Sequence, residues 1–155
     1  MAIDVTIETT VARPPDVVFA RIADIDAWPD WLIASGIVSV TRQTTGPVRA
    51  GERLTVDQRA AGRSGTFAAE VSALEPGRRL ALRGRDEDGV SIDIEADTAP
   101  ADAAEGTGTA LRWTIRIGLP FRYRVFESMA RPQVERAAAL DVEALRRRLE
   151  SAPQD

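Results

Sequence analysis

The sequence predicts an α+β domain in which a curved antiparallel sheet of six to seven strands is covered by one long C-terminal helix. Apolar and polar residues alternate with period two over most of residues 36–118, as in strands with one buried face. A helical apolar pattern follows, and two short helical segments separate the first strand from the others. The C-terminal helix is the only long element available to cover the sheet. Because a curved sheet leaves space that one helix does not fill, we expect a cavity between them.

The N-terminal part is predicted to contain one strand and two short helices. Residues 3–8 alternate between apolar and acidic or hydroxyl side chains, as in a half-buried strand. Residues 13–16, Arg-Pro-Pro-Asp, suit the first turn of a helix, where proline is tolerated and an acidic side chain meets the positive end of the dipole. That helix is expected to end near Ala23. A second short helix holds Trp28 and Trp31.

The next strands are separated by turns that glycine and proline mark. Alternation predicts strands at residues 37–42, 53–59, 67–73, 80–82, 90–95 and 111–117. Turns are expected at 45–47, 61–65, 76–77 and 88–89, the last being an Asp-Gly hairpin signal. Residues 100–108, rich in Ala, Asp and Gly, are predicted to form a polar hairpin loop. Consecutive strands joined by short connections are expected to be neighbours.

The long helix is predicted over residues 124–150 because its apolar residues recur at helical spacing. One broad face holds Phe126, Ala130, Val134, Ala137, Ala144 and Leu145. Residues 118–120, Gly-Leu-Pro, end the sheet before it.

The composition limits the chemistry of the chain. Its 155 residues are expected to form a single domain over 1–155, large enough to bury its own core. There is no His and no Cys, and all 20 basic residues are Arg. This excludes His-based triads, thiolate nucleophiles, Schiff-base lysines and most zinc or transition-metal sites. We therefore expect no cofactor and no metal.

The charge and the hydropathy pattern limit the kinds of partner and the location that we expect. A net charge of −4 argues against a nucleic-acid partner, because phosphate contacts need a basic face. No charged leader precedes an apolar run, and no run of about 18 apolar residues occurs, so we expect no export signal, no membrane span and a cytoplasmic location. The absence of Lys and Asn, both encoded by A-rich codons, fits a GC-rich bacterial genome.

Six segments spread over nearly the whole chain carry a resemblance to a known superfamily. They are residues 12–19 (ARPPDVVF), 24–31 (DIDAWPDW), 46–51, 71–80, 108–111 and 145–150. In this order they resemble the START/polyketide-cyclase superfamily (SRPBCC), and look most like its polyketide cyclase/dehydrase-like branch. The resemblance implies a helix-grip fold with a hydrophobic pocket between the sheet and the last helix. It does not choose a function, because the superfamily includes lipid carriers, hormone receptors, aromatase/cyclases and chaperone activators.

Apolar residues on the predicted inner face form the first set of candidate ligand contacts. They are Trp28, Trp31, Val56, Phe67, Val71, Ile92, Ile94, Trp113, Phe126 and Met129. Periodicity does not distinguish residues that line a pocket from residues that fill a core, so both readings stay open. If the two tryptophans near position 30 wall the pocket, Trp31→Ala is expected to weaken binding of an apolar probe more than it lowers stability.

Polar residues on apolar faces form the second set. Gln58 continues the inward parity of its strand, Asp141 interrupts the apolar stripe of the long helix, and Tyr123 stands at the helix entrance. All three are candidate ligand contacts and the candidate catalytic groups, with a solvated rim or simple packing as the alternative. Arginines near strand ends, one of which could hold a ligand carboxylate or phenolate, are Arg42, Arg59, Arg63, Arg83 and Arg85.

Three function classes follow from these features. The leading hypothesis is a monomeric or homodimeric protein that binds or carries a hydrophobic small molecule, such as a lipid, isoprenoid or polyketide-like aromatic. The alternative is a polyketide aromatase/cyclase that acts by positioning its substrate. A module that binds a protein partner is the second alternative and predicts an exposed apolar patch instead of a pocket.

Overall fold

The computed structural model, which describes residues 2–60, 62–103 and 106–152, contains a seven-stranded antiparallel sheet. The strands are β1 (Ala2–Val11), β2 (Ile37–Arg42), β3 (Arg53–Ala60), β4 (Arg63–Glu75), β5 (Arg79–Arg85), β6 (Ser91–Ala103) and β7 (Gly106–Gly118). Their order across the sheet is β1-β7-β6-β5-β4-β3-β2, so consecutive strands are neighbours from β2 to β7 and the first strand pairs with the last. This confirms the predicted sheet.

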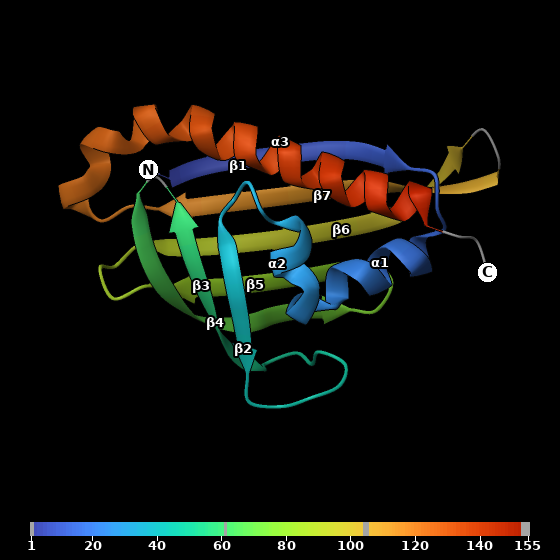
Figure 1. The fold of residues 1–155 in the computed structure, drawn as a ribbon, viewed down its shortest axis with the longest axis horizontal. Helices are drawn as coiled ribbons and strands as arrows, with labels where there is room; N and C mark the ends of the chain where they lie inside the picture. The colour runs from blue at the N-terminus through green and yellow to red at the C-terminus, as the bar shows by residue number, and fades with distance from the viewer. Residues whose placement is uncertain (1, 61, 104–105, 153–155) are drawn as a thin grey trace.

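Helices lie on one side of this sheet. Between β1 and β2 the chain forms α1 (Pro15–Ala23), the 3₁₀ turn η1 (Ile25–Ala27) and α2 (Trp28–Trp31). After β7 come the 3₁₀ segment η2 (Phe121–Phe126) and the 25-residue helix α3 (Glu127–Ser151). The sheet bends beneath α3, and α1 and α2 lie below the C-terminal half of that helix (Figure 1). The helix-grip fold expected from the sequence is therefore present, with the first turn of its long helix tightened to 3₁₀ geometry.

The prediction of a polar loop at residues 100–108 is wrong. β6 continues to Ala103 and β7 begins at Gly106, with Pro100 opposite Thr109; residues 104–105 lie outside the described part. Pro100 is tolerated because its ring nitrogen points away from β7. The N–H of Thr98 donates to the carbonyl of Arg78, and Pro100 has the same parity but lies beyond Asp97, which pairs with Arg79, the first residue of β5. The missing N–H therefore removes no ladder hydrogen bond.

The turn predicted at residues 61–65 is also too long. β4 begins at Arg63, which pairs with Ala60 of β3, and residue 61 lies outside the described part. Gly62 has φ of +74°, a left-handed conformation that glycine adopts without strain and that permits the tight reversal.

The core lies between the concave face of the sheet, the short helices and the C-terminal half of α3. The C-terminal half contributes Ala138, Val142, Leu145 and Leu149, all nearly inaccessible to solvent. Val18 and Ile22 of α1 are also fully buried. Burial of such side chains contributes on the order of 1.5–3 kcal/mol each.

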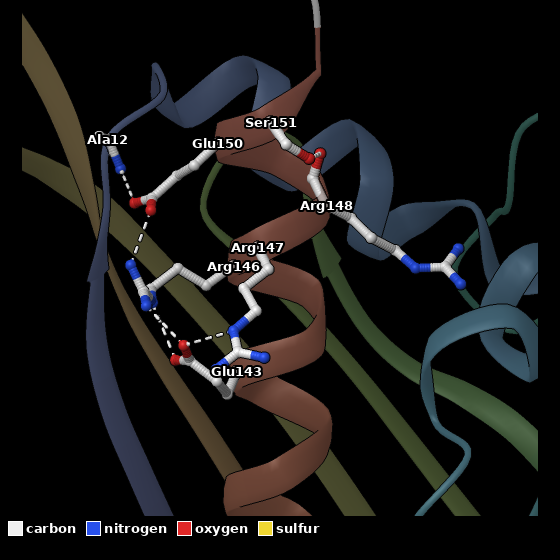
Figure 2. A network of polar contacts seen from close by, with 7 residues as sticks. All are labelled: Ala12, Glu143, Arg146, Arg147, Arg148, Glu150 and Ser151. Atoms are coloured by element: carbon white, nitrogen blue, oxygen red, sulfur yellow. Dashed lines mark hydrogen bonds and ion pairs between the residues drawn. The ribbon is translucent and has the colours of Figure 1, made fainter.

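Polar contacts fix the C-terminal end of α3. The Glu150 carboxylate accepts a hydrogen bond from the backbone N–H of Ala12 at 2.8 Å, and Arg146 bridges Glu150 and Glu143 on the same helix (Figure 2). The Arg13 guanidinium donates to the carbonyl of Leu149 at 2.8 Å, which satisfies one of the last carbonyls of the helix. Among the described helices, none combines the length and hydropathy that crossing a bilayer requires.

Candidate functional site

A cavity of about 790 Å³ lies between the concave face of the sheet and the N-terminal half of α3. Its apolar walls are Ile3, Leu32, Ile37, Phe67, Val90, Ile92, Ile94, Trp113, Ile115, Ile117, Leu119, Phe126, Ala130, Val134 and Ala137. Its mouth is bordered by the α2–β2 loop, the β3–β4 turn and η2, where lining residues such as Ala34, Ala60 and Phe126 are exposed to solvent. The volume falls within the range typical of small-molecule sites.

Small side chains on both walls explain why this space stays open. α3 presents Ala130, Val134 and Ala137 towards it, and β4 contributes Gly65. The short helices fill the concave face only beneath the C-terminal half of α3 (Figure 1). The cavity therefore occupies the part of the concave face that α1 and α2 do not reach.

The structure brings seven of the predicted site residues together around the cavity. They are Gln58, Phe67, Ile92, Ile94, Trp113, Tyr123 and Phe126. They come from β3, β4, β6, β7 and η2, so distant parts of the chain meet at one surface. Whether they contact a ligand stays a prediction.

The other predicted residues lie elsewhere. Trp28 and Val56 border a smaller space of about 20 Å³, which shares Ile37, Phe67 and Ile94 with the wall of the large cavity and holds no more than a water molecule. Trp31 and Val71 are each only 1% exposed, within the core. Met129 points outwards with 64% of its surface exposed. These side chains do not line the large cavity.

The three tryptophans pack against one another as a core cluster. The ring centroids of Trp31 and Trp113 are 5.3 Å apart, those of Trp28 and Trp113 are 5.8 Å apart, and both contacts are edge-to-face. The Nε1–H of Trp28 donates to the carbonyl of Ile22 at 2.8 Å. Such aromatic pairs contribute beyond their buried area. Of the three, only Trp113 lines the cavity, and Trp28 and Trp31 pack against Trp113.

Asp141 ties α3 to the loop at the mouth of the cavity. Its carboxylate is buried and accepts hydrogen bonds from the backbone N–H groups of Ala34 and Ser35 at 2.8 and 2.9 Å. Burial raises the pKa of Asp141 above its usual range, and the hydrogen bonds from Ser35 and Ala34 offset this only in part. Asp141 does not line the cavity, so the arrangement makes it a positioning group for the loop.

Gln58 and Gly36 hold the same loop from the sheet side. The Gln58 amide donates to the carbonyl of Ser35 at 2.9 Å. Gly36 has φ of +78°, and a Cβ at this position would lie 2.1 Å from the carbonyl oxygen of Arg59. Only glycine fits there. The loop bordering the mouth is therefore fixed by α3, by β3 and by its own backbone.

Polar side chains converge at the end of the cavity near η2. The Arg63 guanidinium lies 5.6 Å from the centre of the Tyr123 ring and 3.5 Å from an Asp86 oxygen, and it also pairs with Asp88. Asp86 is buried, and its other oxygen accepts hydrogen bonds from the N–H groups of Asp88 and Val90, both at 2.9 Å, which offset the cost of burying the carboxylate. This arrangement can present guanidinium and phenol donors to a ligand oxygen.

The structure separates the five candidate arginines. Arg59 and Arg63 line the cavity, whereas Arg42, Arg83 and Arg85 do not. Arg42 is buried in ion pairs with Glu52 and Asp26. The three-dimensional arrangement of the strand ends distinguishes these residues, because parity and turn signals in the sequence do not show which strand end borders a cavity.

Several lining residues were absent from the predicted set. Ile115 and Ile117 share the parity of Trp113, and Ala130, Val134 and Ala137 share the helical stripe of Phe126, so periodicity contained the signal. Asp86 and Gln133 had no comparable signal. Within the described residues, no group of three carboxylates is placed to hold a metal ion.

Solved structures resemble this fold closely at low sequence identity. The Zhui aromatase/cyclase from Streptomyces sp. R1128 matches with a TM-score of 0.76 and 20% identity, covering 97% of this chain and 94% of that one. The protein TTHA0849 from Thermus thermophilus matches with a TM-score of 0.73 and 16% identity over 97% and 99% of the two chains. A START superfamily protein from Mycobacterium smegmatis matches at 0.64 and 17% over 95% and 94%.

The sequence itself supplies the assignment to a family. No curated protein matches it significantly. The family described as polyketide cyclase/dehydrase and lipid transport has a sequence model that matches residues 2–150. With nearly the whole chain matched and the helix-grip fold in place, the chain belongs to this polyketide cyclase/dehydrase and lipid transport family.

Proposed function

We propose that this protein binds and carries a hydrophobic small molecule in the cavity between the sheet and α3. The observation that carries the proposal is a 790 Å³ space with walls made mostly of aliphatic and aromatic side chains. Membership of a family that includes lipid transport supports the same function. The polar groups near η2 would orient one end of the ligand.

Energetics favour a large apolar ligand such as an isoprenoid or a polycyclic aromatic. Burying about 300 Å² of ligand surface contributes roughly 7–8 kcal/mol at ~25 cal/mol/Å². Association costs at least about 4 kcal/mol, which leaves an affinity near millimolar. Burying about 500 Å² would leave roughly 8 kcal/mol and an affinity near micromolar.

A cavity-filling substitution tests this function. Ala137→Phe places a ring in the cavity, and we expect it to abolish binding of the neutral fluorescent probe N-phenyl-1-naphthylamine. The matched control is Ala139→Phe, because Ala139 is on the same helix, is exposed and does not line the cavity. Fluorescence titration of the three proteins gives the affinities, and thermal unfolding reports whether each variant is folded. Equal probe binding by wild type and Ala137→Phe would refute the proposal.

A second candidate function is an aromatase/cyclase-like activity on a poly-β-ketone. The convergence of Arg63, Tyr123 and Asp86 at one end of an apolar cavity favours it, because guanidinium and phenol donors can polarise a carbonyl. The test is the product distribution from a short poly-β-ketone thioester, measured by mass spectrometry with wild type, Arg63→Gln and the outer-face control Arg83→Gln. A distribution identical to that in buffer would exclude this activity.

A further inference from the structure

We infer that η2 and the first turn of α3 form a docking surface for an anionic lipid bilayer. The surface consists of Phe121, Val125, Phe126 and Met129, together with Arg122 and Arg124. The inference concerns the outer face of this segment and does not depend on what the cavity binds.

The apolar side chains of this surface are unusually exposed. The exposed fractions are 84% for Phe121, 77% for Val125, 64% for Met129 and 51% for Phe126. Four large hydrophobic residues are thus exposed within nine positions, whereas the other exposed large hydrophobics, Ile33, Val38 and Leu140, are isolated along the chain. Clustered exposed apolar side chains mark interaction sites in soluble proteins.

The apolar residues of the surface follow one another closely along the chain. Val125 and Met129 lie about one turn apart across the start of α3, and Phe121 precedes them in the 3₁₀ segment, offset from Val125 by about a third of a turn. The segment begins after Pro120 and runs along the open end of the molecule, beyond the area where α1 and α2 pack (Figure 1). It is therefore free to lie in the plane of a membrane interface, in the manner of an amphipathic helix.

The charge of the segment points to an anionic partner. Residues 121–129 contain two arginines and one glutamate, a net charge of +1, whereas the whole chain carries −4. The Arg124 guanidinium lies 5.8 Å from the centre of the Phe121 ring, and no carboxylate among the described residues pairs with it. The Arg122 guanidinium donates to the carbonyl oxygen of Asp88 at 2.7 Å and lies 3.9 Å from its carboxylate, so Arg124 is the arginine of the surface that stays available to an anion. Arginines beside exposed apolar side chains fit phosphate head groups above an acyl layer.

The docking surface lies next to the mouth of the cavity. Tyr123 and Phe126 of the same segment line the cavity, so the mouth would face the bilayer when η2 is docked. In the α2–β2 loop, which also borders the mouth, Ile33 is 68% exposed and precedes the lining residue Ala34. A docked protein would thus have exposed apolar side chains from two segments that border the mouth.

Vesicle sedimentation tests the inference. We expect wild-type protein to sediment with mixed phosphatidylcholine–phosphatidylglycerol vesicles and much less with phosphatidylcholine alone. The double variant Phe121→Ser/Val125→Ser should reduce the partition coefficient at least about tenfold, because it removes the two most exposed apolar side chains. Arg124→Gln should lower it about threefold and weaken its dependence on salt.

A matched double variant serves as the control. Val38→Ser/Leu140→Ser removes two side chains that are 53% and 57% exposed but lie outside the surface, so it should sediment like wild type. N-phenyl-1-naphthylamine binding in solution shows separately whether each variant keeps its fold and cavity. Absence of sedimentation, or equal loss in both double variants, would overturn the inference. Light scattering that shows a dimer dependent on Phe121 and Val125, without vesicle binding, would also overturn it and assign the surface to a second copy.

Discussion

The two halves of α3, which meet near Ala137, carry similar apolar residues in different surroundings. From Ala138 onwards the helix buries Ala138, Val142, Leu145 and Leu149, and Glu150 joins it to the β1–α1 connection. Up to Ala137, the residues Ala130, Val134 and Ala137 face the cavity, and Met129 is exposed to solvent. One continuous helix therefore has a packed half and an open half.

The difference shows that the elements packed opposite an apolar stripe of a helix decide whether the stripe becomes part of the core or the wall of a cavity. α1 and α2 occupy the concave face beneath the packed half, so the stripe there becomes core (Figure 1). No described element fills the concave face beneath the open half, and the same stripe becomes a cavity wall. Stability should depend on the packed half, and ligand binding on the open half.

The largest effect is expected for Trp31→Ala, which tests the boundary between the two halves. Trp31 is in contact with Trp28 and Trp113 and does not line the large cavity. Its loss should therefore lower the free energy of unfolding by about 3–5 kcal/mol. This reverses the sequence-based expectation that binding would suffer most. Urea denaturation checks it, and an unfolding free energy close to wild type with impaired probe binding would restore that expectation.

The next prediction compares the loss of stability caused by one substitution in each half of α3. Leu145→Ala removes a fully buried side chain and should cost about 2–5 kcal/mol. Val134→Ala enlarges the cavity from its wall, so it should cost less than about 1 kcal/mol while changing probe affinity. Denaturation gives the free energy of unfolding of each variant, and probe titration gives its affinity. Equal stability losses would mean that the open half is packed in solution.

A smaller loss of stability than for Leu145→Ala is expected at Asp141, where the packed half is joined to the mouth of the cavity. Asp141→Asn leaves an amide that accepts from only one of the two N–H groups now bonded, so it should cost about 1–3 kcal/mol at neutral pH. Relief from burying a charge would place the value towards the lower end.

The pH dependence gives this substitution a second measurement. Because the pKa of Asp141 is raised on folding, the folded state binds its proton more readily than the unfolded state. The stability of wild type relative to Asp141→Asn should therefore rise as the pH falls through the folded pKa towards the unfolded value of about 3.9. Denaturation at a series of pH values measures the difference. A relative stability that falls over this range would show that the hydrogen bonds outweigh burial.

Much of the fold follows from local sequence. Alternation located all seven strands, and the spacing of Phe126, Ala130 and Val134 located the long helix. These signals are strong because each element buries one face, which imposes a period on its own residues. The misplaced loop at residues 100–108 marks the limit, because Pro100 fits a strand only where the neighbouring strand has already ended.

The sequence by itself determined which residues face inwards, because the parity of a strand and the stripe of a helix are local properties. It did not determine which inward residues touch one another and which face a void. Trp31 and Trp113 have equally apolar neighbours in sequence, yet only Trp113 reaches the cavity. The tertiary structure decided this, because the space between sheet and helix depends on how far α1 and α2 extend beneath α3, and no residue encodes that distance locally.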